Sequence, residues 1–371
     1  MATIKDVAKH AGVSTATVSR VLNGTAKVSD ETHRRVQQSI NTLGFEPDFL
    51  ARSWRTRVTH TIAAVVSDNT SPHHGVALRE ASTVALAHNY TLILCTTFSD
   101  PKIEKQYLRM LRERRIDGVL LNTVGKCDDE IRALTESGIP VVLLNRPLRD
   151  YGPLVDAVVV DSYRGSRTLV EHLIGVGHRR IAVVYSEALN DFHKRARLRG
   201  YRDALRAHGL PYEENLVRAT KLGRRDGREF VTQQLVFSPR PTVLYAAGYS
   251  TGLATIATLQ AQGLRIPADI AFAMFDDVTW GEFVDPPLTV VRNPAQELGR
   301  QAMELLFARL ADRSRPPQEI VLAPSVVVRR SCGWPGLAAA ALAKSAETQD
   351  SLILGASSEN EEEETGWRKV L

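Results

Sequence analysis

The feature that most constrains this chain is an alternation that runs from Thr61 to about Arg330. Short apolar runs are separated by amphipathic stretches of helix length. The runs are TIAAVV, TLILCT, GVLL, VVLL, AVVV, IAVVY, TVLYA and IAFAMF. This alternation is typical of buried parallel strands joined by crossover helices. We therefore expect an α/β fold with parallel sheets. Because the region spans roughly 270 residues, we expect two lobes rather than one.

The first 46 residues follow a different pattern, with helical periodicity and no strand-like run. A first helix is expected between Thr3, whose hydroxyl can cap it, and Gly12. A second covers TATVSRVLN after the capping residue Ser14, and a third runs from Ser29 to Gly44. Two short helices joined by a turn that contains glycine form a helix-turn-helix.

The outer face of the second helix suits the major groove of DNA. Thr15 and Ala16 are small enough to allow close approach, and Arg20 can make a bidentate contact with guanine. Nearby hydroxyl groups suit phosphates. They belong to Thr3, Ser14, Thr17 and Ser19. Residues 1–60 hold nine Lys or Arg against five Asp or Glu. This excess favours a DNA-binding module over the alternative, a generic three-helix bundle.

The composition narrows the remaining classes. A net charge of +5 indicates a polyanionic partner. The three cysteines, Cys95, Cys127 and Cys332, are far apart, so we expect no disulfide framework, no metal site and no cofactor. No apolar run approaches the roughly 18 residues of a membrane-spanning helix. The first residues lack the apolar core of a signal peptide, and a cytoplasmic protein is expected.

Several longer stretches carry a resemblance to a known family. The most specific are TIKDVAKHAGVSTATVSRVLNG, VSDETHRRVQQSINTLGFEP and ARS. Further stretches, in the same order, are ILCTTFSDPKIEKQYLRMLRERRIDGVLL, GIPVVLLNRP, VEHLIGVGHRRIAVV, RLRGYRDAL, IPADIAFAMFDD and PPLTVVRNP. Together they resemble the lactose-repressor-like (LacI/GalR) transcription regulators over residues 2 to about 333.

The resemblance implies an architecture and partners. It predicts a helix-turn-helix headpiece over residues 1–46, a hinge helix and linker over 47–59, and a two-lobed effector-binding and dimerisation domain over 60–333. That domain resembles periplasmic sugar-binding proteins. Residues 334–371 are expected to form a disordered tail. The family's members are homodimers, some tetramers, that bind pseudo-palindromic operator DNA and respond to a small-molecule effector. Here we expect a repressor.

The resemblance also assigns DNA contacts. The base-reading positions are Thr15, Ala16 and Arg20. Positions near phosphates are Ser14, Thr17, Ser19 and Asn23. In the hinge segment DFLARSWR, the residues expected at the DNA are Ala51, Arg52, Trp54 and Arg55. The family usually has Leu where Trp54 stands. We expect Trp54 to enter the minor groove as a wedge between two base pairs. The alternative is that it packs between two hinge helices or under the effector lobe.

Eight residues are expected to contact the effector. They are Asp68, His73, His74, Asn145, Arg197, Arg225, Gly248 and Asp276. Arg197 and Asp276 match ligand-contacting residues of the family, whereas other positions depart from it. Gly248 and Tyr249 replace an Asn-Asp pair, and Asn145 stands where an Asp is common. The trend is toward positive charge, which favours a sugar acid or sugar phosphate over a neutral sugar. The alternative is that Arg224 and Arg225 are solvated loop residues.

The stretch GYSTG matches the nucleophile elbow of serine hydrolases, with Ser250 as the nucleophile. In that fold the histidine follows the serine, but none of the ten histidines lies after Ser250. We therefore expect no enzyme. A small-molecule binding protein without operator function is the other alternative. Salt-dependent binding to a palindromic duplex separates a DNA-binding regulator from both.

Overall fold

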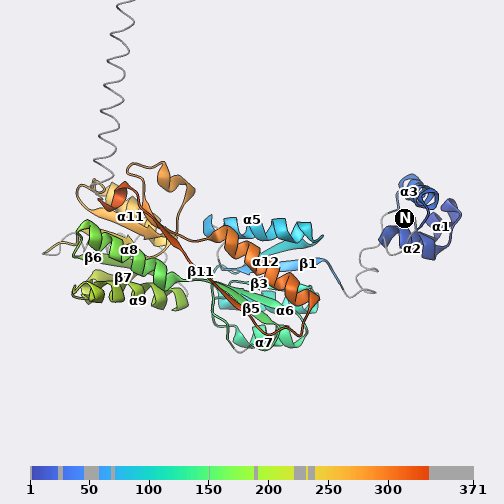
Figure 1. Cartoon of the computed structure of the whole chain (residues 1–371), viewed down its shortest axis with the longest axis horizontal. Coiled ribbons are helices and arrows are strands. Elements are labelled where there is room, and N and C mark those ends of the chain that lie inside the picture. Colours follow the sequence, from blue (N-terminus) through green and yellow to red (C-terminus); the bar gives the residue numbers. More distant parts are fainter. Residues whose placement is uncertain are drawn as a thin grey trace, which may run out of the picture. The chain divides into compact units, whose positions relative to one another are not determined.

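The computed structural model describes residues 2–23, 28–45, 58–67, 72–149, 151–187, 191–220, 231–232 and 239–333. The chain divides into two compact units, Met1–Thr59 and His60–Leu371. Figure 1 shows the course of the chain through both of them.

The N-terminal unit contains the three expected helices. They are α1 (Ile4–Ala11), α2 (Thr15–Asn23) and α3 (Asp30–Leu43). Thr3 and Asp6 form a reciprocal capping box at the start of α1, and Gly12 ends this helix with φ 63°. The helices share a small apolar core. Its buried members are Val7, Ala8, Ala11, Val18, Val21 and Val36.

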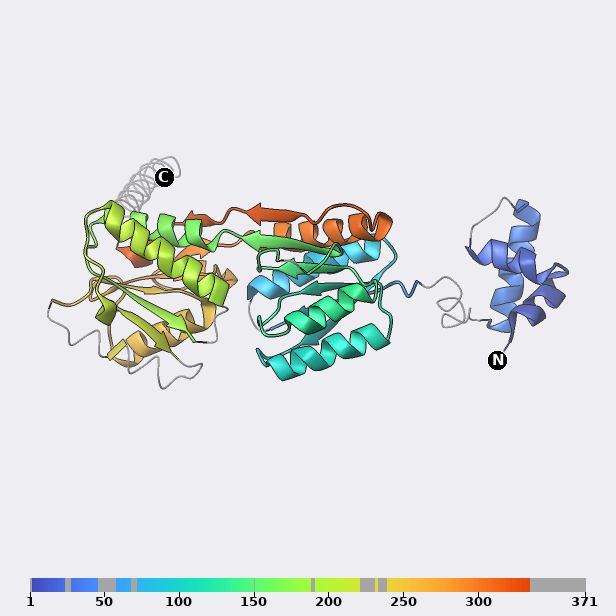
Figure 2. The ribbon, with the colours of Figure 1, turned by 90° about the horizontal axis from the view of Figure 1, so that it is seen from below.

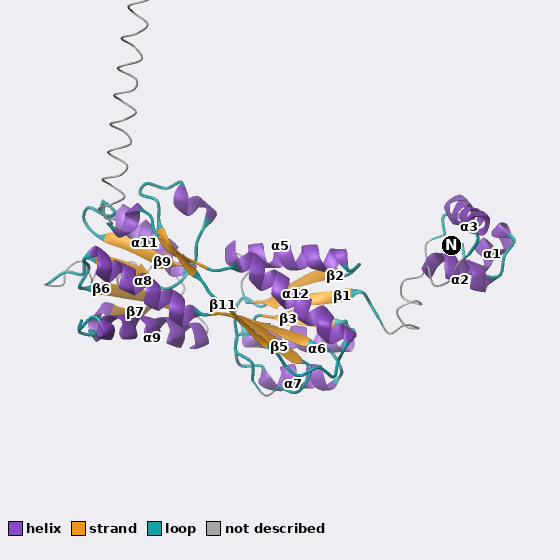
Figure 3. Cartoon of the chain, viewed as in Figure 1, coloured by secondary structure: helices purple, strands orange, loops and turns teal. Residues whose placement is uncertain are grey.

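The larger unit has two lobes, each built on a six-stranded sheet (Figure 3). The sheet of the N-terminal lobe has the order β11-β5-β4-β3-β1-β2, and all its strands are parallel. Its strands are β1 (Thr61–Val66), β2 (Thr91–Thr96), β3 (Gly118–Leu121), β4 (Val141–Leu144), β5 (Val155–Val160) and β11 (Glu319–Leu322). Its helices are α5 (Pro72–Ala87), α6 (Pro101–Glu113), α7 (Asp128–Glu136) and α12 (Ala295–Ala311).

The sheet of the C-terminal lobe has the order β12-β10-β9-β8-β6-β7. Its strands are β6 (Ile181–Ser186), β7 (Val217–Thr220), β8 (Val243–Ala246), β9 (Ala271–Phe275), β10 (Thr289–Arg292) and β12 (Ser325–Val327). Only β12, at the edge, runs antiparallel to its neighbour. The helices are α8 (Ser162–Val176), α9 (Asp191–Ala207) and α11 (Tyr249–Ala261), with short 3₁₀ turns η1 (Glu214–Leu216), η2 (Thr279–Glu282) and η3 (Arg330–Cys332).

Both sheets are covered on both faces, which explains why their central strands are mainly apolar and buried, whereas the edge strands β2, β7, β11 and β12 are partly exposed. In the N-terminal lobe, α5 and α12 pack side by side on one face and α6 and α7 cover the other (Figures 1 and 2). The chain crosses between the lobes after β5, after β10 and after β11. These crossings bring the carboxyl ends of the parallel strands of both lobes to the boundary between them, where ligands of open α/β sheets bind.

A buried ion pair fixes the end of α12 to the N-terminal sheet. Arg309 and Asp156 are both fully buried, and the guanidinium contacts the carboxylate through Nε (3.0 Å) and Nη2 (2.9 Å). Asp156 also accepts a hydrogen bond from the Gln318 N–H at 2.8 Å, at the entry to β11. The pair therefore anchors the helix and the strand that follows it.

Removing one partner leaves the other buried charge uncompensated, so Arg309→Met should lower the free energy of unfolding by about 3–5 kcal/mol. Arg112 is exposed on α6 of the same lobe, and Arg112→Met should change the free energy of unfolding by less than about 0.5 kcal/mol. Urea unfolding followed by circular dichroism measures both. Equal midpoints for the two variants would contradict a stabilising role of the pair.

Candidate functional site

The start of α2 forms a small exposed surface in the N-terminal unit. Thr15, Ala16 and Arg20 are exposed, whereas Val18 and Val21 face the core. The Ser14 Oγ accepts a hydrogen bond from the Thr17 N–H at 3.1 Å, which caps the helix. The structure thus places the predicted base-reading residues on one open face of α2.

The other predicted DNA contacts are placed less completely. Thr3 is exposed and Ser19 is half-buried. The side chain of Asn23 lies outside the described part of the chain, as do the hinge residues. These are Ala51, Arg52, Trp54 and Arg55.

In the larger unit, Arg197 and Asp276 lie close together at the carboxyl ends of the strands of the C-terminal lobe. Arg197, from α9, is 6% exposed. Its Nη1 donates to the Ala247 carbonyl at 2.9 Å, its guanidinium lies 3.6 Å from the centre of the Phe275 ring, and its Nη2 lies 4.0 Å from Asp276 Oδ1. A Cβ on Gly248 would lie 3.6 Å from Arg197 Nη1. This position is therefore next to the guanidinium.

Asp276 directly follows β9 and has a positive φ of 79°. Its carboxylate accepts hydrogen bonds from the Tyr249 N–H at 3.1 Å and from Asn293 Nδ2 at 2.6 Å. These contacts orient one carboxylate with groups that follow β8 and β10.

Asn145 holds the corresponding place in the N-terminal lobe, after β4. Its Oδ1 accepts from the Val160 N–H at 3.3 Å, and its Nδ2 lies 3.3 Å from His73 Nε2. Because the amide nitrogen donates, His73 Nε2 accepts and its proton is assigned to Nδ1. That Nδ1 is buried and has no partner among the described residues. His73 therefore presents an unused donor.

Burial lowers the pKa of His73 to about 4, with a further lowering by His74 and Arg197 and an opposing effect of Asp276. The His74 ring centre lies 5.7 Å from that of His73. Six of the eight predicted effector residues thus lie close together at the lobe boundary. They are His73, His74, Asn145, Arg197, Gly248 and Asp276. The other two are Asp68 and Arg225. Those two, with Arg224, lie outside the described residues.

The polar side chains at the lobe boundary form a layer, which we call the polar layer. It comprises His73, His74, Asn145, Arg197 and Asp276. His193 also belongs to it, although the sequence gives no signal for its position. It is buried on α9, and its Nδ1 lies 2.9 Å from Ser162 Oγ. Burial lowers its pKa to about 3, with contributions from Arg197 and His73, while a hydrogen bond to the Asn145 backbone opposes the shift.

A cleft of about 620 Å³ opens between the lobes beside this layer. Its lining is strongly basic, with five cationic side chains against Glu187 alone among the charged residues that line it. The cations are Lys126, Arg146, Arg149, Arg195 and Arg199. The sequence does not distinguish these five residues, because lysines and arginines in loops and helices are common on protein surfaces.

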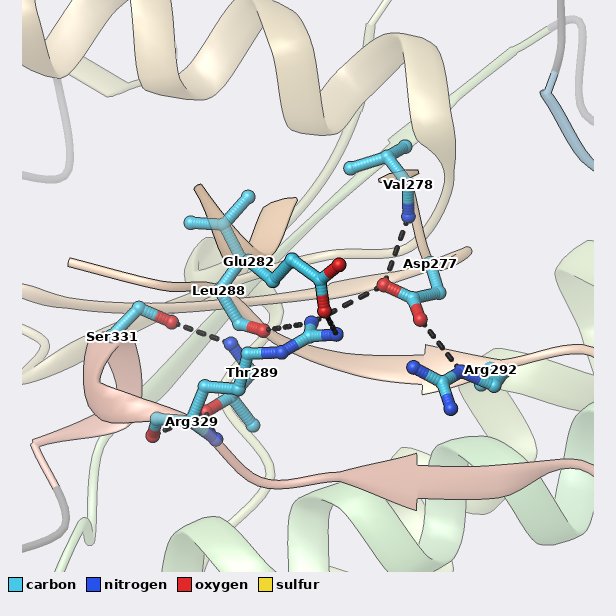
Figure 4. Close-up of polar contacts among 8 residues, drawn as sticks. All are labelled: Asp277, Val278, Glu282, Leu288, Thr289, Arg292, Arg329 and Ser331. Carbon is cyan, nitrogen blue, oxygen red and sulfur yellow. Dashed lines mark hydrogen bonds and ion pairs between the residues drawn. The ribbon is translucent and has the colours of Figure 1, made fainter. Parts of the chain in front are cut away.

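A network of ion pairs supports the turn after Asp276 (Figure 4). Asp277 accepts from Arg292 Nε at 2.7 Å and from Arg329 Nη1 at 3.2 Å. A second cavity of about 510 Å³ is lined by both arginines together with His73 and Asn293. The Asn293 Oδ1 is buried without a partner among the described residues. His73 and Asn293 thus line this cavity, while their unpaired atoms, the donor Nδ1 and the acceptor Oδ1, are buried behind its wall.

The GYSTG motif does not form a hydrolase site within the described residues. Ser250 is exposed in the first turn of α11 and makes no hydrogen bond to a described histidine. Among the described residues, no group of His, Cys, Asp and Glu side chains is arranged to hold a metal ion. No described helix has both the length and the apolarity that crossing a membrane requires.

A helix-turn-helix and a two-lobed domain with a polar cleft define a DNA-binding regulator that responds to a small molecule. Comparison with known proteins gives the family. Residues 3–48 match the model "Bacterial regulatory proteins, lacI family", and residues 59–322 match "Periplasmic binding proteins and sugar binding domain of LacI family". The chain belongs to the LacI family of transcriptional regulators, as predicted.

Individual relatives support this family assignment. The chain is 33% identical to the HTH-type transcriptional repressor PurR of Haemophilus influenzae (strain PittEE), over 89% of this chain and 98% of PurR. It is 31% identical to the regulator DegA of Bacillus subtilis (strain 168), over 89% and 97%. Among solved structures, the transcriptional regulator CelR–cellobiose complex matches with a TM-score of 0.66 and 32% identity, over 89% of this chain and 100% of that one. The operator-bound lac repressor dimer shares the fold, with a TM-score of 0.75 and 24% identity, over 89% and 99%.

The lowered pKa values of His73 and His193 predict a pH dependence of stability. Because the folded-state pKa of His73 is about 4, below the ordinary value near 6.5, only the unfolded chain binds this proton between those values. Stability should therefore fall as the pH falls through that window, by up to about 1.4 kcal/mol per pH unit for each such histidine. Melting temperatures between pH 7.5 and 4.5 should fall less steeply in His73→Gln. The exposed His208→Gln is the control, and an unchanged slope in His73→Gln would contradict the prediction.

Proposed function

We propose that this regulator responds to an anionic polyhydroxyl compound, a sugar acid or a sugar phosphate, bound between the lobes. The observation that carries the proposal is the charge of the cleft, where five cations face one acid. Arginine binds carboxylate and phosphate groups through paired hydrogen bonds. A cleft of this charge would also draw anions from solution and repel cations.

The polar layer supports the hydroxyl groups of this ligand. A hydroxyl group both donates and accepts a hydrogen bond. The second cavity, which shares no lining residue with the basic cleft, has a buried donor, His73 Nδ1, and a buried acceptor, Asn293 Oδ1, behind its wall, and both lack partners among the described residues. Unpaired buried polar groups are costly, and a bound hydroxyl group could form a hydrogen bond with either the donor or the acceptor.

Two relatives in the family are described with neutral sugars, cellobiose and ribose. Here Gly248 presents no side chain beside Arg197. In our proposal this leaves the guanidinium available to the ligand, in place of the Asn that the family typically carries there.

For DNA binding, we propose that Thr15, Ala16 and Arg20 read bases and that Trp54 acts as a minor-groove wedge in a homodimer on a pseudo-palindromic operator. The exposed face of α2 supports the first part. Effector binding would act by population shift, since a ligand moves an equilibrium only through its different affinities for the two states.

The ligand class is tested by thermal shift of the full chain against sugar acids, sugar phosphates and neutral sugars. Anionic members should raise the melting temperature and change the affinity for operator DNA, and Arg197→Gln should reduce the response. A ligand present at a hundred times its Kd stabilises the folded state by about 2.7 kcal/mol. Stabilisation by neutral sugars alone would refute the anionic effector.

The wedge is tested with Trp54→Ala and Trp54→Leu. Wedges stay in place only if they offset the cost of unstacking a base step, so Trp54→Ala should weaken operator binding and reduce DNA bending, while Trp54→Leu keeps most of both. Gel-shift affinity and circular-permutation bending measure the two effects. Unchanged affinity and bending in Trp54→Ala would rule out the wedge.

A further inference from the structure

Arg146 is a buried cation of the cleft whose hydrogen-bonding capacity is only partly used. It directly follows Asn145, lines the cleft, and has a side chain only 6% exposed. Among the described residues its ion pair is with Asp128, from Nη2 to Oδ1 at 3.9 Å, and its Nε has no hydrogen-bond acceptor. A buried guanidinium with five donors is costly unless anions and acceptors surround it.

Asp128 does not neutralise Arg146 by itself. Its side chain is 43% exposed, and its carboxylate also accepts a hydrogen bond from the Tyr151 hydroxyl at 2.9 Å and lies 3.5 Å from Arg149 Nη1. One carboxylate is thus divided between two arginines and a tyrosine.

A second carboxyl group near Arg146 among the described residues is Glu104, which interacts with it electrostatically but whose oxygens are hydrogen-bonded to other donors. It accepts from the Thr123 hydroxyl and from the Val124 N–H at 2.8 Å. The guanidinium of Arg146 also packs directly on Gly125, where an added Cβ would collide with it. Arg146 is therefore held in place by packing, with hydrogen-bonding capacity left over.

The other lobe places two arginines on the same cleft. Arg195 and Arg199 are exposed and four residues apart on α9, so they share one face of this helix. The Arg199 guanidinium lies 4.4 Å from the centre of the Tyr163 ring, which supports its position.

We infer that Arg146 anchors a phosphate group of the effector, and that Lys126, Arg195 and Arg199 complete its binding site from both lobes. This rests on the proposed anionic effector and narrows it to a phosphate monoester. The lining has five cations and one acid, and Asp128 pairs with two of these cations, which leaves an excess of three charges. A monoester supplies up to two negative charges at pH 7 where a carboxylate supplies one. The three terminal oxygens of the monoester also accept hydrogen bonds from several directions, which a site formed by residues of two lobes requires.

The test is a thermal-shift titration of the full chain with inorganic phosphate, D-gluconate and D-glucose at constant ionic strength. Phosphate should stabilise the wild type, and Arg146→Gln should weaken its apparent Kd by about tenfold or more, the size expected for losing a bidentate charge-assisted contact. Arg146→Lys keeps the charge but loses the fork, so its loss should be smaller. Arg132→Gln, at an exposed position on α7 outside the cleft, is the matched control and should respond like the wild type.

Each outcome decides between the hypotheses. A wild type that does not respond to phosphate overturns the inference, and if gluconate stabilises it the proposed anionic effector still stands. Stabilisation by glucose alone overturns both. Wild-type affinity in Arg146→Gln and Arg146→Lys overturns the role of Arg146. If Arg146→Gln does not fold, the preference of Arg146→Lys for phosphate over gluconate decides: it should shrink, and an undiminished preference counts against the inference.

Discussion

The hydrogen bonds of Asn145 hold the polar side chains of the N-terminal lobe in place, and the arrangement of the candidate effector site depends on them. Its side chain contacts the Val160 N–H, where the chain leaves β5 for the C-terminal lobe, and His73 of α5. Its backbone also acts on the pKa of His193, which comes from α9 of the C-terminal lobe. Asn145 has a positive φ of 55°, a conformation that asparagine tolerates better than most residues. One residue thus connects α5 with the end of β5 at the lobe boundary.

The neutrality of the two histidines follows from this packing. Burial and the charge of Arg197 together favour the uncharged forms of His73 and His193. If both were charged, three cations would lie close to a single carboxylate, Asp276. With both neutral, Arg197 and Asp276 carry the charge of the layer, and the histidines serve as directional donors and acceptors.

Much of the fold could be predicted from the sequence. The apolar runs marked most of the strands, and the Thr3–Asp6 and Ser14 caps marked the helices of the headpiece. The order of strands could not be predicted, because local periodicity carries no information on pairing partners. β11 and β12 show this best, since neighbours in sequence join different sheets and their residues are mostly exposed or half-buried.

The candidate site was predictable only where a motif marked it. Arg197 and Asp276 were found through family motifs, whereas His193 and Arg146 were not. His193 sits four residues before Arg197 on α9, and only the packing of α9 against Ser162 shows that it faces the lobe boundary. Arg146 follows Asn145 in the motif LLNRP, but its burial depends on Gly125 from a different loop. Such contacts are non-local, and sequence spacing does not encode them.

The division of the cleft between two lobes bears on how a ligand could act as a signal. A ligand held by one lobe alone would bind the open and closed forms with similar affinity, so it would not shift the equilibrium between them. Moving a two-state equilibrium from 1:99 to 99:1 requires about 5.5 kcal/mol of differential affinity. Arg146 lies in one lobe, whereas Arg195 and Arg199 lie on α9 of the other. A group bound by all three gains its second set of contacts only when the lobes close. Charge-assisted hydrogen bonds in a closed, partly dry cleft are each worth about 1.5–3 kcal/mol. About two to four such contacts are therefore needed to supply this difference.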